Sequence, residues 1–226
     1  MQTIKTFGVI GTGIIGAGWA ARALARGLNV LAFDPGVDAQ DRLRDNLTQV
    51  WPVLERTGLF PGASVDRLRF CDSLEEVALG AQFIQESAPE RIELKTTLHA
   101  QIDAAAPVDV LIASSTSGLL PSEFQSHCAH PGRVMVGHPF NPVYLLPLVE
   151  VLGGEQTDAD NIERAVALYR DLGMYPLKVR SEVPGFLSDR LQEALWREIL
   201  HLVNDDVATP EELDAAICYG PGLRWA

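Results

Sequence analysis

The stretch that decides the fold is GVIGTGIIGAGW, residues 8–19, an apolar run that contains five glycines. Apolar runs are usually buried, whereas glycine at this density loosens regular structure. Both features occur together where a buried strand turns sharply into a helix. Residues 5–10 before the turn have the pattern of a strand, and residues 14–27 after it have the pattern of a helix.

The glycines of this turn have the spacing Gly-x-Gly-x-x-Gly. Gly11 permits the tight turn, Gly13 lets the backbone approach a pyrophosphate, and Gly16 allows the helix to pack closely on the strand. The start of the helix then offers N–H groups and a partial positive charge to phosphates. The residues expected to bind the dinucleotide here are Gly11, Thr12, Gly13, Ile14, Ile15 and Gly16.

An acidic residue follows the second predicted strand. Asp34 comes directly after residues 29–33, twenty-three residues beyond Gly11. A carboxylate at this place accepts hydrogen bonds from the adenosine ribose hydroxyls and repels a 2′-phosphate. No arginine follows it directly, so the sequence predicts NAD rather than NADP. The alternative, a glycine-rich turn in an unrelated sheet, leaves the strand, the helix and the distal acid unexplained.

Further strand and helix patterns alternate along the chain. The predicted strands cover residues 67–71, 82–86, 109–114, 133–137, 148–152 and 176–180, and the helices 37–57, 89–106 and 158–172. This alternation predicts an α/β fold with a doubly wound, Rossmann-type parallel sheet that has helices on both faces. We therefore assign residues 1–181 to an NAD-binding domain.

Residues 182–226 have a different, all-helical pattern. Pro184 suits the first position of a helix, and apolar residues then recur at about every fourth position from Leu187. A second helix is expected after Thr209, with Glu212 completing a capping box. Two helices cannot easily bury both of their faces, so we expect the first helices of a truncated substrate or dimerisation domain.

Composition limits the class of partner. The formal net charge of −12 argues against nucleic acid and against anionic membrane surfaces, which attract basic proteins. The same charge suits a small cationic ligand. The three cysteines have no metal-binding or disulfide spacing, and neither a membrane span nor a signal peptide is evident. We expect a cytoplasmic protein with reduced thiols.

Two further segments offer side chains for chemistry. His138 follows a predicted strand, at the sheet edge where open α/β folds bind ligands. Glu150 lies in an apolar strand, where it needs a partner, and a carboxylate beside His138 would raise the basicity of the imidazole. A structural histidine and a surface glutamate are the alternative. His127 and His130 lie in a loop without a third ligand, so no metal site is predicted.

Together these residues resemble the 3-hydroxyacyl-CoA dehydrogenase superfamily. The resemblance consists of the glycine motif, Asp34, SSTS at 114–117, HPFNP at 138–142 with Glu150 twelve residues after His138, and VPGFLSDRL at 183–191. It implies an NAD-dependent 3-hydroxy acid dehydrogenase that is a homodimer in its full-length form. It also implies that His138 is the general base and that Glu150 is its partner.

The resemblance assigns further roles to single positions. Ser117 would bind the substrate oxygen, Glu90 and Lys95 would contact the nicotinamide half of NAD, and Asn141 and Asp189 would lie at the substrate. The small hydroxyl residues at 114–117 are equally suited to ordinary turn and capping chemistry.

Two departures from the family pattern concern the substrate. The coenzyme-A enzymes usually have Asn where this chain has Asp189, and they tend to have Lys near Pro147. Losing a cation and gaining an anion favours a small cationic 3-hydroxy acid over a CoA thioester. The alternatives are a dehydrogenase of a 3-hydroxyacyl-CoA or of L-gulonate, and a non-catalytic, crystallin-like NAD-binding protein.

Overall fold

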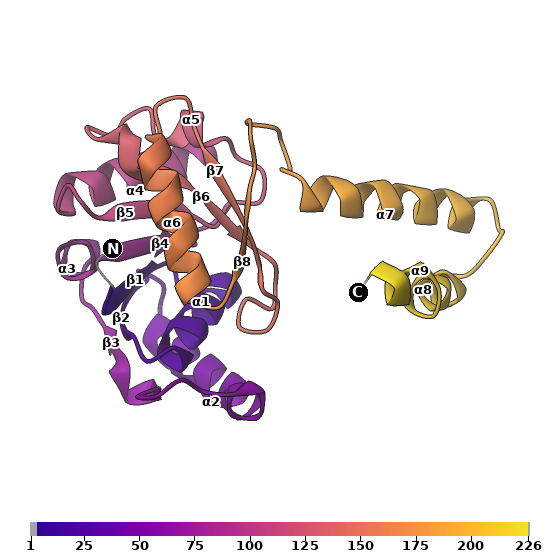
Figure 1. Cartoon of the computed structure of the whole chain (residues 1–226), viewed down its shortest axis with the longest axis horizontal. Coiled ribbons are helices and arrows are strands. Elements are labelled where there is room, and N and C mark those ends of the chain that lie inside the picture. The colour runs from indigo at the N-terminus through magenta and orange to yellow at the C-terminus, as the bar shows by residue number, and fades with distance from the viewer. Residues whose placement is uncertain (1–3, 226) are drawn as a thin grey trace. The chain divides into compact units, whose positions relative to one another are not determined.

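The structure, a computed structural model, describes residues 4–225. The chain divides into two compact units, one ending at Pro184 and the other beginning at Gly185. Figure 1 labels the helices and strands of both units.

An eight-stranded sheet forms the centre of the first unit, in the order β3-β2-β1-β4-β5-β6-β7-β8. The strands are β1 (Thr6–Ile10), β2 (Asn29–Phe33), β3 (Leu68–Phe70), β4 (Phe83–Glu86), β5 (Leu111–Ser114), β6 (Val134–Pro139), β7 (Leu148–Gly153) and β8 (Tyr175–Lys178). The strands from β3 to β6 in this order are parallel. The prediction of a Rossmann-type sheet is confirmed.

The prediction that every strand is parallel is wrong at β7, which runs antiparallel to β6. Only residues 140–147 separate the two strands, and a parallel crossover needs a dozen or more residues. The antiparallel register places His138 directly opposite Glu150. The connection is therefore what brings the two candidate catalytic side chains together.

Helices cover both faces of the sheet. Successive strand residues point to opposite faces, and in β4 Gln85 contacts Tyr169 of α6 whereas Glu86 contacts Lys95 of α4. Helices α1 and α2 pack together and share the hydrophobic core of the α6 face. Helices α3 and α5 both contact α4. The helices are α1 (Ile14–Ala25), α2 (Ala39–Thr57), α3 (Leu74–Gly80), α4 (Ile92–Ala105), α5 (Pro121–Phe124) and α6 (Ala159–Asp171).

An aromatic cluster fills the core between the sheet and α1 and α6. Phe7 stacks on Phe83 at 5.5 Å between ring centroids, and Trp19 lies 5.5 Å from Tyr169. Both Trp19 and Tyr169 are fully buried. The cluster fixes α1, and with it the glycine turn, against the centre of the sheet.

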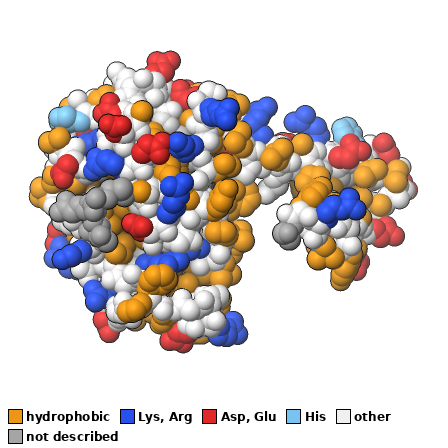
Figure 2. All heavy atoms as spheres, in the orientation of Figure 1, with side chains coloured by type: hydrophobic (Ala, Val, Ile, Leu, Met, Phe, Trp, Pro, Cys, Tyr) orange, Lys and Arg blue, Asp and Glu red, His pale blue; other side chains and the backbone are white. Residues whose placement is uncertain are grey.

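The second unit contains α7 (Ser188–Asn204), α8 (Pro210–Cys218) and α9 (Pro221–Trp225). The capping box of Thr209 and Glu212 at the start of α8 is confirmed. The expected helix start at Pro184 is wrong, because Gly185 and Phe186 have φ angles of +73° and +45° and α7 begins only at Ser188. Hydrophobic side chains are visible on the surface of this unit in Figure 2.

The sequence predicts that the chain has no membrane span and that its cysteines are reduced. Within residues 4–225, none of the helices has both the length and the apolar character that a membrane crossing requires. Cys71, Cys128 and Cys218 are all unpaired, and burial raises the pKa of the Cys128 thiol to about 12.

Candidate functional site

The glycine turn has the geometry that a bound diphosphate needs. Gly11 has φ +87°, and a Cβ on it would lie 2.7 Å from the backbone of Ser87. A Cβ on Gly16 would lie only 1.9 Å from the carbonyl oxygen of Gly11, so α1 packs directly on the turn. A Cβ on Gly13 would meet no atom within 4 Å. The backbone is therefore accessible at Gly13, immediately before the first turn of α1, as dinucleotide binding requires.

Asp34 closes this turn from the end of β2. Its Oδ2 accepts a hydrogen bond from the Thr12 N–H at 2.7 Å, and its Oδ1 accepts one from the Gly36 N–H at 2.8 Å. Oδ2 also accepts the Thr12 hydroxyl at 3.3 Å. A carboxylate oxygen can accept two hydrogen bonds, so Oδ1 has capacity left for a ribose hydroxyl.

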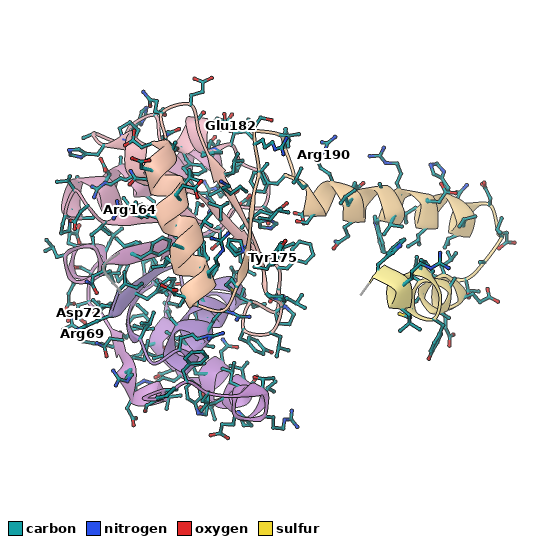
Figure 3. All side chains as sticks on the ribbon, viewed as in Figure 1. Arg69, Asp72, Arg164, Tyr175, Glu182 and Arg190 are labelled. Carbon is teal, nitrogen blue, oxygen red and sulfur yellow. The ribbon has the colours of Figure 1, made fainter. Side chains whose placement is uncertain are left out.

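A pocket of about 810 Å³ adjoins Asp34 and the glycine turn. Its apolar walls include Phe33, Leu74, Leu94 and Leu98, which suit a flat purine ring. Asp72, labelled in Figure 3, lines the pocket just beyond the end of β3. The residues present fit the adenosine half of NAD.

Two glutamates accept hydrogen bonds from the hydroxyl residues at the end of β5 and just after it. Ser114 donates to Oε2 of Glu86 at 2.5 Å, and Thr116 donates to Oε1 of Glu90. The same Glu90 oxygen accepts the N–H of Ser117 at 3.0 Å. Ser117 itself is exposed. Glu90 thus shapes the turn that presents Ser117, and a direct contact between Glu90 and the cofactor stays a prediction.

Lys95 is buried beneath this turn. It is 1% exposed, and its Nζ lies 2.8 Å and 3.0 Å from the two carboxylate oxygens of Glu86, which is fully buried. Nζ also donates to the Ala88 carbonyl at 3.1 Å. These acceptors use the protons of the ammonium group, so any contact with the nicotinamide half of NAD would be mainly electrostatic. That contact also remains a prediction.

His99 packs against the same carboxylate. Its Nε2 lies 3.7 Å from Oε2 of Glu86, and its Nδ1 lies 2.8 Å from the Lys95 carbonyl. Burial lowers the pKa of His99 below its usual range, so the ring is neutral at pH 7. Only Lys95 therefore supplies a full positive charge to Glu86 within this cluster.

His138 and Glu150 meet across the β6–β7 pair. The His138 Nδ1 lies 2.9 Å from Oε2 of Glu150. His138 is 4% exposed and Glu150 is fully buried. A buried carboxylate at this distance fixes the orientation of the imidazole. The contact that sequence spacing suggests is present.

The remaining predicted residues belong to other segments of the chain. Asn141 is exposed in the loop after β6, and Asp189 lies in the first turn of α7 in the second unit. His127 and His130 are exposed in their loop. Among residues 4–225 no group of three or more His, Cys, Asp or Glu side chains could hold a metal ion.

Four polar residues close to the site were missed by sequence reasoning: Gln85, Glu86, Ser87 and Tyr169. The sequence does contain a signal for Glu86. Like Glu150, it is a carboxylate in an apolar strand and therefore needs a partner. Gln85 and Tyr169 had no such signal. Their hydrogen bond joins residues 84 positions apart.

Two family models match the chain. The model described as "3-hydroxyacyl-CoA dehydrogenase, NAD binding domain" matches residues 6–183, and "3-hydroxyacyl-CoA dehydrogenase, C-terminal domain" matches residues 185–226. Together they span nearly the whole sequence.

Curated relatives share most of this sequence. An L-carnitine dehydrogenase of Pseudomonas aeruginosa is 62% identical over 223 residues, which cover 99% of this chain and 70% of the relative. An L-carnitine dehydrogenase of Bacillus cereus is 52% identical over 225 residues, covering 100% of this chain and 69% of the relative.

Solved structures have the same fold. The 5-formyl-3-hydroxy-2-methylpyridine 4-carboxylic acid 5-dehydrogenase, an NAD+-dependent dismutase, matches with a TM-score of 0.90 and 35% identity, covering 98% of this chain and 72% of that chain. The 3-hydroxybutyryl-CoA dehydrogenase of Escherichia coli matches with a TM-score of 0.86 and 30% identity, covering 96% of this chain and 46% of that chain.

Proposed function

The chain belongs to the 3-hydroxyacyl-CoA dehydrogenase family, and from that premise we propose that it oxidises the 3-hydroxyl of L-carnitine to 3-dehydrocarnitine, with His138 as general base. It is an NAD-dependent dehydrogenase that acts on a CH–OH group. The substrate and the roles of single residues are the proposed part. The resemblance supports a homodimer, and the unpaired cysteines support a cytoplasmic location.

The observation that carries the mechanism is the 2.9 Å contact between His138 and Glu150. With Nδ1 held by the carboxylate, His138 takes the hydroxyl proton of the substrate at Nε2. Glu150 stabilises the imidazolium that forms. Ser117, exposed in the turn that follows β5, positions the substrate oxygen. Bound NAD supplies the hydride acceptor.

The choice of substrate rests on sequence similarity and on charge. Residues 138–154 and 193–204 are similar to L-carnitine 3-dehydrogenase, and the curated relatives with that activity in their names support the same substrate. Carnitine combines a 3-hydroxy acid with a trimethylammonium group. Asp189 supplies negative charge to a cationic substrate, and Pro147 stands where the coenzyme-A enzymes tend to have a lysine.

Substrate profiling tests this proposal. We expect NADH to form from NAD and L-carnitine, measured by its absorbance, with far lower kcat/KM for 3-hydroxybutyryl-CoA and L-gulonate. Reduction of acetoacetyl-CoA without any activity on carnitine would overturn the choice of substrate. Binding of NADH without turnover of any of these compounds would favour the non-catalytic alternative.

A substitution at Asp189 tests the charge argument separately. Asp189→Asn keeps the shape of the side chain but removes its charge. A single charge pair at close range in a solvated site is worth about 1 kcal/mol, so KM for L-carnitine should rise about fivefold. Asp205→Asn, which changes an acid at the end of α7, is the matched control. An unchanged KM would exclude Asp189 from recognition of the cation.

A further inference from the structure

A series of hydrogen bonds, buried at α6 and partly buried towards its other end, runs from α6 to the dinucleotide pocket. Tyr169 contacts Gln85 at 2.7 Å, Gln85 contacts Ser115 at 2.8 Å, and Ser115 contacts Ser87 at 2.9 Å. Tyr169 and Gln85 are fully buried, and Ser87 lines the pocket beside Gly11. These hydrogen bonds therefore connect the core of the first unit to the place where the cofactor fits.

The orientation of the Gln85 amide follows from its neighbours. A side-chain nitrogen and oxygen are hard to distinguish by shape, but the carbonyl of Gly137, 3.0 Å away, can only accept a hydrogen bond. The atom facing Gly137 must therefore be Nε2. Oε1 then faces Tyr169, whose hydroxyl must donate to it.

The direction of the next bond follows from counting donors at Ser115. A hydroxyl oxygen accepts at most two hydrogen bonds and donates one. The Ser115 oxygen accepts from Gln85 Nε2 at 2.8 Å and from the indole N–H of Trp19 at 3.1 Å. Both of its acceptor positions are occupied, so Ser115 must donate its proton to Ser87.

Ser87 therefore accepts from Ser115 and keeps its own proton for another acceptor. Residues 4–225 show no hydrogen bond of the Ser87 hydroxyl other than the one with Ser115. Every donor in this series of hydrogen bonds points towards the pocket. The bonds therefore polarise one another, which strengthens the hydrogen bond that the Ser87 hydroxyl can donate. We propose that Ser87 donates a hydrogen bond to a ribose or phosphate oxygen of bound NAD, with its direction set by Tyr169, Gln85 and Trp19.

This inference depends on NAD binding and not on the identity of the substrate. Its test is therefore a titration with NADH in the absence of carnitine, followed by the fluorescence of NADH. Failure of the proposed carnitine activity would leave this result unaffected.

The first variant removes the donor. Loss of one hydrogen bond at a bound ligand should raise the dissociation constant of NADH about fivefold to tenfold in Ser87→Ala. Ser126→Ala is the matched control, because Ser126 is exposed and its hydroxyl donates to the Glu123 carbonyl outside the pocket. A dissociation constant for Ser87→Ala within about twofold of the wild-type value would overturn the proposal.

The second variant lets the hydrogen bond between Ser115 and Ser87 reverse its direction, and it changes no residue that lines the pocket. Gln85→Met opens one acceptor position on Ser115, so Ser87 can donate to Ser115 instead of to the cofactor. We expect weaker NADH binding in Gln85→Met, and no further weakening when Ser87→Ala is added. If the increases in the NADH dissociation constant of the two single variants multiply in the double variant, Gln85 does not act through Ser87 and the proposal is overturned. Trp19→Phe opens the other acceptor position on Ser115 and replaces Gln85→Met if that variant does not fold.

Discussion

Replacing His138 with alanine is expected to lower kcat for L-carnitine oxidation by about 10²–10⁴-fold, the range that general acid–base catalysis contributes. The hydroxyl must lose its proton as the substrate is oxidised, and His138, near the end of β6, is the residue proposed to accept it. The dissociation constant of NADH should stay near its wild-type value, because His138 is absent from the lining of the pocket around Asp34.

Glu150→Gln is the companion variant for this prediction. It keeps the size of the side chain opposite His138 but removes the charge that, in the proposed mechanism, stabilises the imidazolium and fixes the tautomer. We expect a large loss of kcat here as well, again with NADH binding retained. Turnover of His138→Ala close to the wild-type rate, in protein that melts normally, would refute the assigned role.

Breaking the Glu86–Lys95 pair is expected to cause the largest loss of stability. Lys95→Met leaves the carboxylate of Glu86 fully buried without a counter-charge, and removal of one partner of a buried pair costs about 3–5 kcal/mol. Each kcal/mol corresponds to about 2–4 °C in a protein of this size, so the melting temperature should fall by about 6–20 °C. Thermal unfolding followed by circular dichroism measures the shift.

Two further variants separate burial from charge. Lys178 and Glu163 form an even shorter ion pair, at 2.6 Å, but their side chains are 52% and 61% exposed, so Lys178→Met should cost only about 0–1 kcal/mol. The double variant Glu86→Gln/Lys95→Met removes both buried charges and should recover much of the lost stability. Equal losses for Lys95→Met and Lys178→Met would contradict this view of the Glu86 cluster.

Local patterns in the sequence were sufficient for the main elements of the first unit. The glycine turn, the strand at 29–33 and the capping box at Thr209 depend on neighbouring residues, and the structure has each of them. The short helix Leu74–Gly80 was missed, although Ser73 caps it and Glu76 supplies the N–H that Ser73 accepts. With seven residues it is too short to show clear periodicity.

Contacts between distant segments were harder to predict. The pairing of His138 with Glu150 was expected from the family resemblance, but the antiparallel register that produces it was not. The hydrogen bonds of Gln85 depend on three separate elements and leave no pattern in the sequence. The loop of residues 140–147 did contain the missed information, since its length excludes a parallel connection.

The most direct test of the catalytic roles is the pH dependence of the reaction in both directions, under conditions where a deuterium isotope effect at carbon 3 shows that chemistry limits the rate. We expect carnitine oxidation to accelerate as pH rises and His138 loses its proton. Reduction of 3-dehydrocarnitine should accelerate as pH falls and the imidazolium becomes available as the acid. Rates that do not vary with pH in either direction would contradict proton transfer by His138.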